Sequence, residues 1–339
     1  MGGALLKVWN LPEKRLLNAE YEEFKSKILD RLAGIFPKNC QLATAPALRD
    51  KPSHGDLDVI VGTTEFFNST ELIKKEFGFK PHVNSNVTSF PVDGFQIDVT
   101  FCPIDKVDSY ISYNSWGDCA NKIGRLAHKM GLHLGHSGLS FWIRQSLFDK
   151  NLEFLDNDNI LEKYVLTTDW SVILPILGLN YDTWKAGFNN QQEVFEWVAT
   201  SKYFNADIFK FEELNHINRT RNRKRPMYAA FVEYLATNSW RYNKYPFQRR
   251  EYYLPVWAGL FPDLKRAIRE NGAKYKKQKE IAAKFNGYIV MEVLGISDGK
   301  LVGQYISTFK KKFDKEAIYD MSKEQIISEI KNLKINEIT

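Results

Sequence analysis

The sequence is poor in the features that mark secreted, zinc-binding or membrane proteins. It has three cysteines, Cys40, Cys102 and Cys119, an odd number with no C-x-x-C spacing. Neither a disulfide framework nor a zinc site is indicated, and a reducing compartment is expected. No apolar run approaches the roughly 20 residues that cross a membrane, and no signal-peptide pattern opens the chain. We therefore expect a soluble protein of the cytoplasm, or alternatively of the nucleus or a virus-infected cell, with no membrane partner.

Repeats and low-complexity tracts are also missing, and what remains is typical of a globular chain. Hydrophobic residues make up 44% of the 339 residues, enough to bury a sizeable core in two or three domains. The net charge of +6, with a pI of about 8.9, is compatible with a polyanionic partner without establishing one.

The most informative stretch is Gly55-Asp56-Leu57-Asp58, which leads into the apolar run Val59 to Val61. Successive side chains of a strand point to opposite faces, so Asp56 and Asp58 project from the same face. Asp98 lies in the middle of a second apolar run, where a lone carboxylate is costly to desolvate. Divalent cations would relieve the repulsion among three acids, and oxygen ligands suit Mg²⁺. A Gly-Asp-x-Asp string alone is also typical of a turn that enters a strand.

This pattern resembles the palm of the polymerase beta nucleotidyltransferase superfamily. The resemblance implies an α+β fold, with a mixed sheet of four or five strands that carries the acids on one face and helices behind. It implies that Asp56 and Asp58 bind two Mg²⁺ ions, for which Mn²⁺ can substitute. Asp98 would bind the catalytic ion and help to deprotonate a 3′ hydroxyl.

The loop before the acids departs from that pattern. The superfamily has a Gly-Ser or Gly-Gly pair ten residues before the glycine of Gly-Asp, where this chain has Ala45-Pro46. Proline contributes no N–H, so triphosphate binding must use other donors, such as Thr44 and Arg49. Arg49 is equally well interpreted as a solvated loop charge. The residues expected to bind substrate here are Thr44, Arg49, Ser53 and Gly55.

A second informative string runs from Tyr113 to Leu139. Asp118 is expected to cap a helix on which Lys122, Arg125 and Lys129 form one basic stripe, and such a stripe is most often solvated surface. The string is similar to the start of the thumb of family X DNA polymerases. That resemblance assigns Asn121 and Asp118 to the incoming nucleotide, and Lys122 and Arg125 to the base or template strand. Lys129, the last residue of the stripe, is a candidate for binding nucleic acid.

The C-terminal half is predicted to be mostly helical, with a basic loop that precedes a run rich in aromatic residues. The loop is either a plain solvated segment or, as we favour, a surface that faces phosphates. Its candidate residues are Arg219, Arg221, Arg223, Lys224 and Arg225. The segments from Phe285 to Ile306 and from Ser322 to Ile327 resemble the C-terminal helical module of CCA-adding tRNA nucleotidyltransferases.

These patterns predict a palm with an N-terminal helix over 1–108, a thumb-like segment over 109–183 and a basic helical domain over 184–339. The predicted activity is two-metal nucleotidyl transfer from a nucleoside triphosphate to the 3′ hydroxyl of a nucleic acid. A family X-like DNA polymerase acting on a primer or gapped duplex is the first interpretation. A tRNA or other RNA nucleotidyltransferase is the alternative, and an inactive nucleic-acid-binding protein with a degenerate palm is a third.

Overall fold

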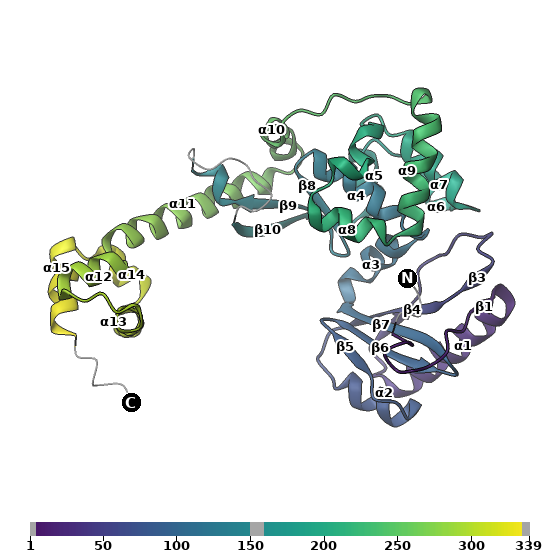
Figure 1. The fold of residues 1–339 in the computed structure, drawn as a ribbon, viewed down its shortest axis with the longest axis horizontal. Helices are drawn as coiled ribbons and strands as arrows, with labels where there is room; N and C mark the ends of the chain where they lie inside the picture. Colours follow the sequence, from purple (N-terminus) through teal and green to yellow (C-terminus); the bar gives the residue numbers. More distant parts are fainter. Residues whose placement is uncertain (1–4, 150–158, 334–339) are drawn as a thin grey trace. The chain divides into compact units, whose positions relative to one another are not determined.

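The computed structural model describes residues 5–149 and 159–333 (Figure 1). Contacts within the chain define two compact units. Unit 1 consists of Met1–Trp142 with Lys163–Trp257, and unit 2 of Ile143–Glu162 with Ala258–Thr339. This division rests on packing alone, so the three-part division by role stays a prediction. The predicted mixture of helices with a mixed sheet is confirmed.

A five-stranded sheet forms the base of unit 1, in the order β2-β4-β7-β6-β5. Strands β4 and β7 are parallel and central, and the other neighbours are antiparallel. The strands are β2 (Gln41–Ala43), β4 (Asp56–Thr63), β5 (His82–Asn84), β6 (Val87–Val92) and β7 (Phe95–Pro103). The sequence Asp93-Gly94, which predicts a type I′ hairpin turn, joins β6 to β7, and both residues have the positive φ, 49° and 75°, that this turn requires.

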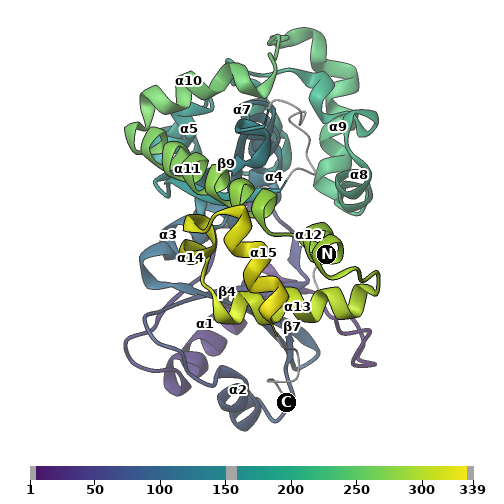
Figure 2. The ribbon, with the colours of Figure 1, turned by 90° about the vertical axis from the view of Figure 1, so that its left-hand side faces the viewer.

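Alternation along the strands separates an apolar face from an acidic one. Leu57, Val59 and Val61 of β4 are buried against α1 (Asn18–Ile35) and α2 (Ser69–Phe77), which cover one face of the sheet (Figures 1 and 2). Asp56 and Asp58 therefore project from the other face. The sequence predicts helices from about Glu20 to Gly34 and from Glu71 to Phe77, and both begin two residues earlier in the structure. The cap of α2 is Asn68, where the pattern favours Ser69 or Thr70.

Residues before α1 are built into the same sheet region. Leu6 is fully buried, and the Trp9 ring meets Phe79 edge-on, with 5.5 Å between ring centroids. Strand β1 (Leu16–Leu17) pairs with β3 (Ser53–His54), immediately before the first acids. The N-terminal segment, for which the sequence predicted no role, thus lies beside the catalytic candidates.

Helices and short strands complete unit 1. They are α3 (Val107–Asn114), α4 (Cys119–Lys129), β8 (Leu132–Gly135), β9 (Gly138–Arg144), β10 (Ile160–Thr167), α5 (Trp170–Ile176), α6 (Tyr181–Ala186), α7 (Gln191–Ala199), α8 (His216–Arg223), α9 (Pro226–Asn238) and α10 (Arg250–Leu260). Strands β9 and β10 and helix α10 continue into unit 2, and β8, β9 and β10 form a three-stranded sheet. Short 3₁₀ helices are Ile104–Lys106, Gln145–Leu147, Ala206–Phe209, Phe211–Glu213 and Ser239–Arg241.

Unit 2 contains a long helix and a small helical cluster. They are α11 (Pro262–Lys284), α12 (Gly287–Leu294), α13 (Gly299–Lys312), α14 (Lys315–Asp320) and α15 (Lys323–Asn332). Helices α12, α13 and α15 pack together around Val290 and Phe309 (Figures 1 and 2). Gly295 ends α12 in the left-handed conformation, which glycine adopts without steric cost. The helical spacing of residues 264–269 and 274–285 predicts two separate helices, but in the structure they form one continuous helix.

None of the helices in the described ranges is both long and apolar enough to span a membrane.

Candidate metal centre and adjoining cavities

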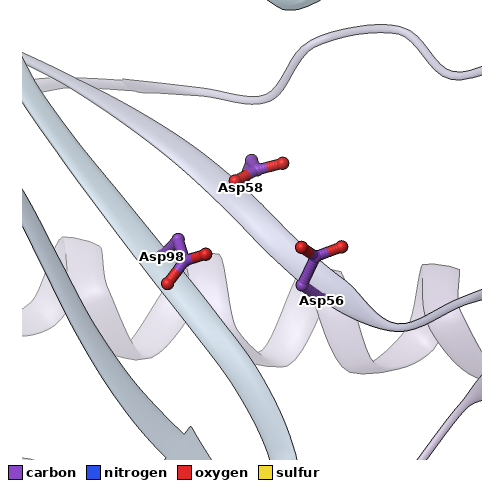
Figure 3. Close-up of side chains that lie close together, drawn as sticks. All are labelled: Asp56, Asp58 and Asp98. Atoms are coloured by element: carbon purple, nitrogen blue, oxygen red, sulfur yellow. The ribbon is translucent and has the colours of Figure 1, made fainter. Parts of the chain in front are cut away.

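Three carboxyl groups meet on the open face of the central strands. Asp58 lies directly beside Asp98 in the parallel register of β4 and β7, and Asp56 lies two residues earlier on β4 (Figure 3). One oxygen from each of the three residues lies within 4.8 Å of the others. Strand alternation predicted that Asp56 and Asp58 share a face, and the buried position of Asp98, together with the resemblance to the palm, predicted that it joins them.

The cluster is not neutralised by the cations of the described chain. No lysine, arginine or histidine nitrogen of residues 5–149 and 159–333 forms an ion pair with these three carboxylates. Burial and the charge of Asp98 raise the pKa of Asp56. Burial, followed by the charges of Asp56 and Asp98, raises the pKa of Asp58 to about 7. The folded chain thus carries an electrostatic cost at this face that a bound cation would relieve.

The surroundings of Asp58 explain why its pKa shift persists although its surface is open to solvent. The residue is exposed by surface area, yet much of the protein surrounds its carboxyl, as expected at the floor of a wide cavity. In such a position burial and the repulsion by two neighbouring carboxylates both disfavour the charged form of Asp58. A cluster of carboxylate oxygens open on one side can hold a metal ion.

Gln96 orients Asp98, and the sequence patterns did not identify it as a site residue. Its side-chain nitrogen donates to both oxygens of Asp98, at 3.0 and 2.8 Å, and its side chain is buried. The alternation that places Asp56 with Asp58 also places Gln96 with Asp98, so the signal was present in the run from Phe95 to Phe101.

A cavity of about 510 Å³ opens above Asp56 and Asp58, within the range of roughly 300–1,000 Å³ that is typical of small-molecule sites. Its other lining residues include Tyr21, Lys51, His54, Tyr113, Asn121 and Arg221. His54 stacks flat on Tyr21, with 3.6 Å between ring centroids. Burial, with the charge of Lys51, lowers the pKa of His54 to about 4, so this ring is neutral at pH 7.

A larger cavity of about 1290 Å³ adjoins the first, and the two share Lys51, Asp56, Asp118, Arg221 and Arg225. Basic residues from three separate segments line it: Lys7 and Arg15 from the N-terminal segment, Lys51 from the loop before β4, and Arg221, Lys224 and Arg225 from the end of α8. Its acidic lining residues are Glu13, Asp56 and Asp118. The balance of charge favours an anionic occupant.

Asp118 stands at the cap position of α4, but its side chain makes no capping hydrogen bond. Its carboxylate instead pairs with Arg225, and its other oxygen lies 3.8 Å from the fully buried ammonium of Lys122. Because Lys122 is buried, the predicted exposed stripe on this helix does not form. Asn121, on the same helix, donates to the buried Asn222 of α8 at 3.2 Å and lines the smaller cavity.

Several other predicted substrate residues have partners within the protein. Arg49 donates to the carbonyl of Ala186 and to Asn189, and with Thr44 it lines a separate neighbouring cavity. Ser53 accepts two hydrogen bonds from Arg15, at 3.0 and 2.9 Å. Gly55 lines the larger cavity. This geometry does not favour the predicted contact between Arg49 and a triphosphate at the Asp56 cavity.

The remaining basic candidates divide into packed and open residues. Arg125 donates to the carbonyls of Ile208 and Glu213, and Arg219 to those of Phe211 and Leu214. Both guanidinium groups thus hold backbone segments in place. Lys129, in the last turn of α4, is half-buried, and Arg223 is exposed. Arg221 and Lys224 are exposed and line the larger cavity.

Comparison with family models and with curated proteins gave no match to this sequence.

Proposed function

We propose that the protein is a nucleotidyltransferase that joins a nucleoside monophosphate from a triphosphate to a 3′ hydroxyl and releases pyrophosphate. The observation that carries the proposal is the set of three carboxylates on adjacent parallel strands, within 4.8 Å of one another and without cationic partners in the described ranges. Such a set can hold divalent cations, and bound cations stabilise the negative charge that develops on phosphate oxygens during nucleotidyl transfer.

The carboxylates of Asp56, Asp58 and Asp98 suit a divalent cation such as Mg²⁺, and in the proposed two-metal reaction these three residues would hold both ions. Ions bound there would lower the pKa of the attacking hydroxyl and neutralise the triphosphate. The residues of the chain orient the reactants. Arg225, fixed by Asp118, and Arg221 present cationic groups beside the acids, where phosphate oxygens would be placed.

The acceptor that we test first is gapped DNA, because the order of palm and thumb motifs resembles family X DNA polymerases. Lys122 and Arg125, to which that resemblance gives contacts with the template, are engaged inside the protein. An RNA acceptor is the second candidate, supported by helices α12, which ends at Gly295, and α13, which begins at Gly299, because this order of elements resembles the tail of CCA-adding enzymes.

The deciding experiment measures Mg²⁺-dependent incorporation of each labelled dNTP and NTP onto gapped DNA, single-stranded DNA and tRNA lacking its 3′ end. Extension of the gap by the complementary nucleotide establishes a templated polymerase. Addition of CTP and ATP to the tRNA alone establishes an end-adding enzyme. No incorporation on all three acceptors would contradict the proposal and favour a nucleic-acid-binding protein.

Asp98→Asn provides the matched test of the site. The variant keeps the size of the side chain and an oxygen that can accept from Gln96, but it removes the charge. We expect incorporation to fall by about 100-fold or more while the affinity for nucleic acid is unchanged. Wild-type rates in this variant would contradict the assignment of the site.

A further inference from the structure

The third carboxylate is linked by hydrogen bonds to the beginning of the chain. Gln96, only 4% exposed, donates through Nε2 to both oxygens of Asp98, and its Oε1 accepts from the backbone N–H of Leu5 at 3.0 Å. Leu5 is 91 residues away in the sequence. One buried amide thus joins the N-terminal segment to the candidate metal centre.

Chemistry fixes the orientation of this amide. A backbone N–H can only donate, so the oxygen of Gln96 must face Leu5 and the nitrogen must face the carboxylate. An ionised carboxylate has about four lone-pair positions, and the two N–H groups of Gln96 occupy at most two of them. Asp98 therefore keeps lone pairs for a cation while its rotation is restricted.

The N-terminal segment is itself held in place, so that it can act as a support. The neighbouring Leu6 is fully buried, and its carbonyl accepts from Leu11 at 2.9 Å. Trp9 packs edge-on against Phe79. These contacts place the Leu5 N–H on a turn anchored to the same unit as the sheet, and an anchored donor holds the amide in one rotamer.

We propose that the N-terminal segment, residues 5–11, is a positioning element of the metal centre, which acts on Asp98 through Gln96. The role in catalysis rests on the proposed function, whereas the role in metal binding does not. Gln96 is a positioning residue, because it touches the candidate ligand rather than the reacting atoms. Groups that orient metal ligands in this way typically contribute 10–100-fold to metal affinity or activity.

The first test compares Gln96→Met with Asn86→Leu in the full chain. Methionine keeps the length of the side chain but cannot donate to Asp98. Asn86 lies beside the same hairpin and donates to the carbonyl of Phe101, away from the acids. With Mn²⁺ as the probe and the signal of free Mn²⁺ in electron paramagnetic resonance as the readout, we expect roughly 10–100-fold weaker binding for Gln96→Met alone.

The second test removes the support without touching Gln96. Leu5→Pro deletes the backbone N–H of residue 5, whereas Leu5→Ala keeps it and loses only the side chain. We expect Leu5→Pro, and not Leu5→Ala, to weaken Mn²⁺ binding. The double variant of Leu5→Pro with Gln96→Met should bind Mn²⁺ about as weakly as either single variant, because both changes break the same link. This pair also decides the matter if Gln96→Met fails to fold.

The kinetic readout separates positioning from nucleotide binding. On the acceptor that wild type extends, Gln96→Met and Leu5→Pro should lower kcat while the KM for the nucleotide changes less than about two-fold. Wild-type Mn²⁺ affinity in Gln96→Met, or equal affinities in Leu5→Pro and Leu5→Ala, would overturn the proposal. If the wild-type protein shows no incorporation and Gln96→Met still binds Mn²⁺ more weakly than wild type, the link to Asp98 is upheld and only the proposed function is rejected.

Discussion

Lys122 illustrates how a single ionisable residue depends on its neighbours. Its ammonium is fully buried, donates to the carbonyl of Asp118 at 3.1 Å and lies over the rings of Phe195 and Phe231. Burial lowers the pKa of Lys122 to about 8, although the charge of Asp118 acts in the opposite direction. This residue was predicted to contact substrate, yet it is packed at the junction of α4, α7 and α9.

We predict that replacement of Lys122 by methionine changes the pH dependence of stability. Below about pH 8 the lysine is protonated in both the folded and the unfolded chain, and the folded state carries the cost of a buried charge. Between about pH 8 and 10.5 only the unfolded chain keeps the proton, so the free energy of unfolding of wild type rises with pH. Lys122→Met lacks this rise.

The difference is measured by urea unfolding at pH 7 and pH 10. From pH 7 to pH 10 the free energy of unfolding of wild type should increase by about 2–3 kcal/mol relative to that of Lys122→Met. Lys75→Met, at an exposed lysine of α2, controls for the loss of one lysine. Parallel profiles for wild type and Lys122→Met would show that the ammonium is not buried in solution.

At the scale of the secondary-structure elements, the sheet could be predicted from the sequence, and the length of α11 could not. Period-two alternation and the Asp93-Gly94 turn define β6 and β7 locally. Asn271 and Gly272 indicate a break within α11, but Asn271 donates to Glu162, and Gly272 lies where a Cβ would come within 2.9 Å of Phe148. These tertiary contacts favour a continuous helix, and no local pattern encodes them.

The close approach of β4 to α3 gives a prediction about stability. A Cβ at Gly62 would lie 2.2 Å from Cγ2 of Val107, which is itself buried. We expect Gly62→Ala to lower the free energy of unfolding by about 1–3 kcal/mol, because the strand and helix must move apart. Gly34→Ala, in α1 with no atom within 4 Å of the new methyl group, should instead stabilise by about 0.5–1 kcal/mol. Denaturant unfolding of both variants decides this, and an unaffected Gly62→Ala would contradict the close packing.

The end of α8 carries a prediction about binding. Arg221 and Lys224 are exposed, line the larger cavity and form no ion pair within the described chain. If nucleic-acid phosphates occupy that cavity, Arg221→Gln with Lys224→Gln should weaken binding and reduce the slope of log K against log salt by about 0.7–0.9 per lost contact.

The matched control places the same change of charge on the opposite side of the sheet. Lys75→Gln with Lys80→Gln alters exposed lysines of α2 and the residues after it, and α2 covers the face of the sheet away from the acids. Fluorescence anisotropy with labelled single-stranded and gapped DNA, at a series of salt concentrations, measures both slopes. Equal slopes for the two double variants would remove the α8 end from the binding surface.

At the scale of the whole molecule, the two units have separate cores. The core beneath the acids is formed by α1, α2 and the central strands, whereas residues 285–333 form a core of their own around Val290 and Phe309. The motifs predicted both groups of elements, but they did not predict the division of the chain. That division depends on segments 143–162 and 258–339 packing together, which only the tertiary structure shows.

Separate cores predict that unfolding of the full chain has two transitions that respond to different changes. Phe309 is fully buried and stacks on Phe285, with 4.2 Å between ring centroids, so Phe309→Ala should cost about 3–5 kcal/mol in unit 2. Mg²⁺ at 100 times its Kd should stabilise unit 1 by about 2.7 kcal/mol, because the three acids lie there.

Calorimetry of wild type, Phe309→Ala and Asp98→Asn, each with and without Mg²⁺, separates these effects. We expect Phe309→Ala to lower one transition, Mg²⁺ to raise the other, and Asp98→Asn to abolish only the Mg²⁺ effect. A single transition that moves with both changes would show that the units unfold together.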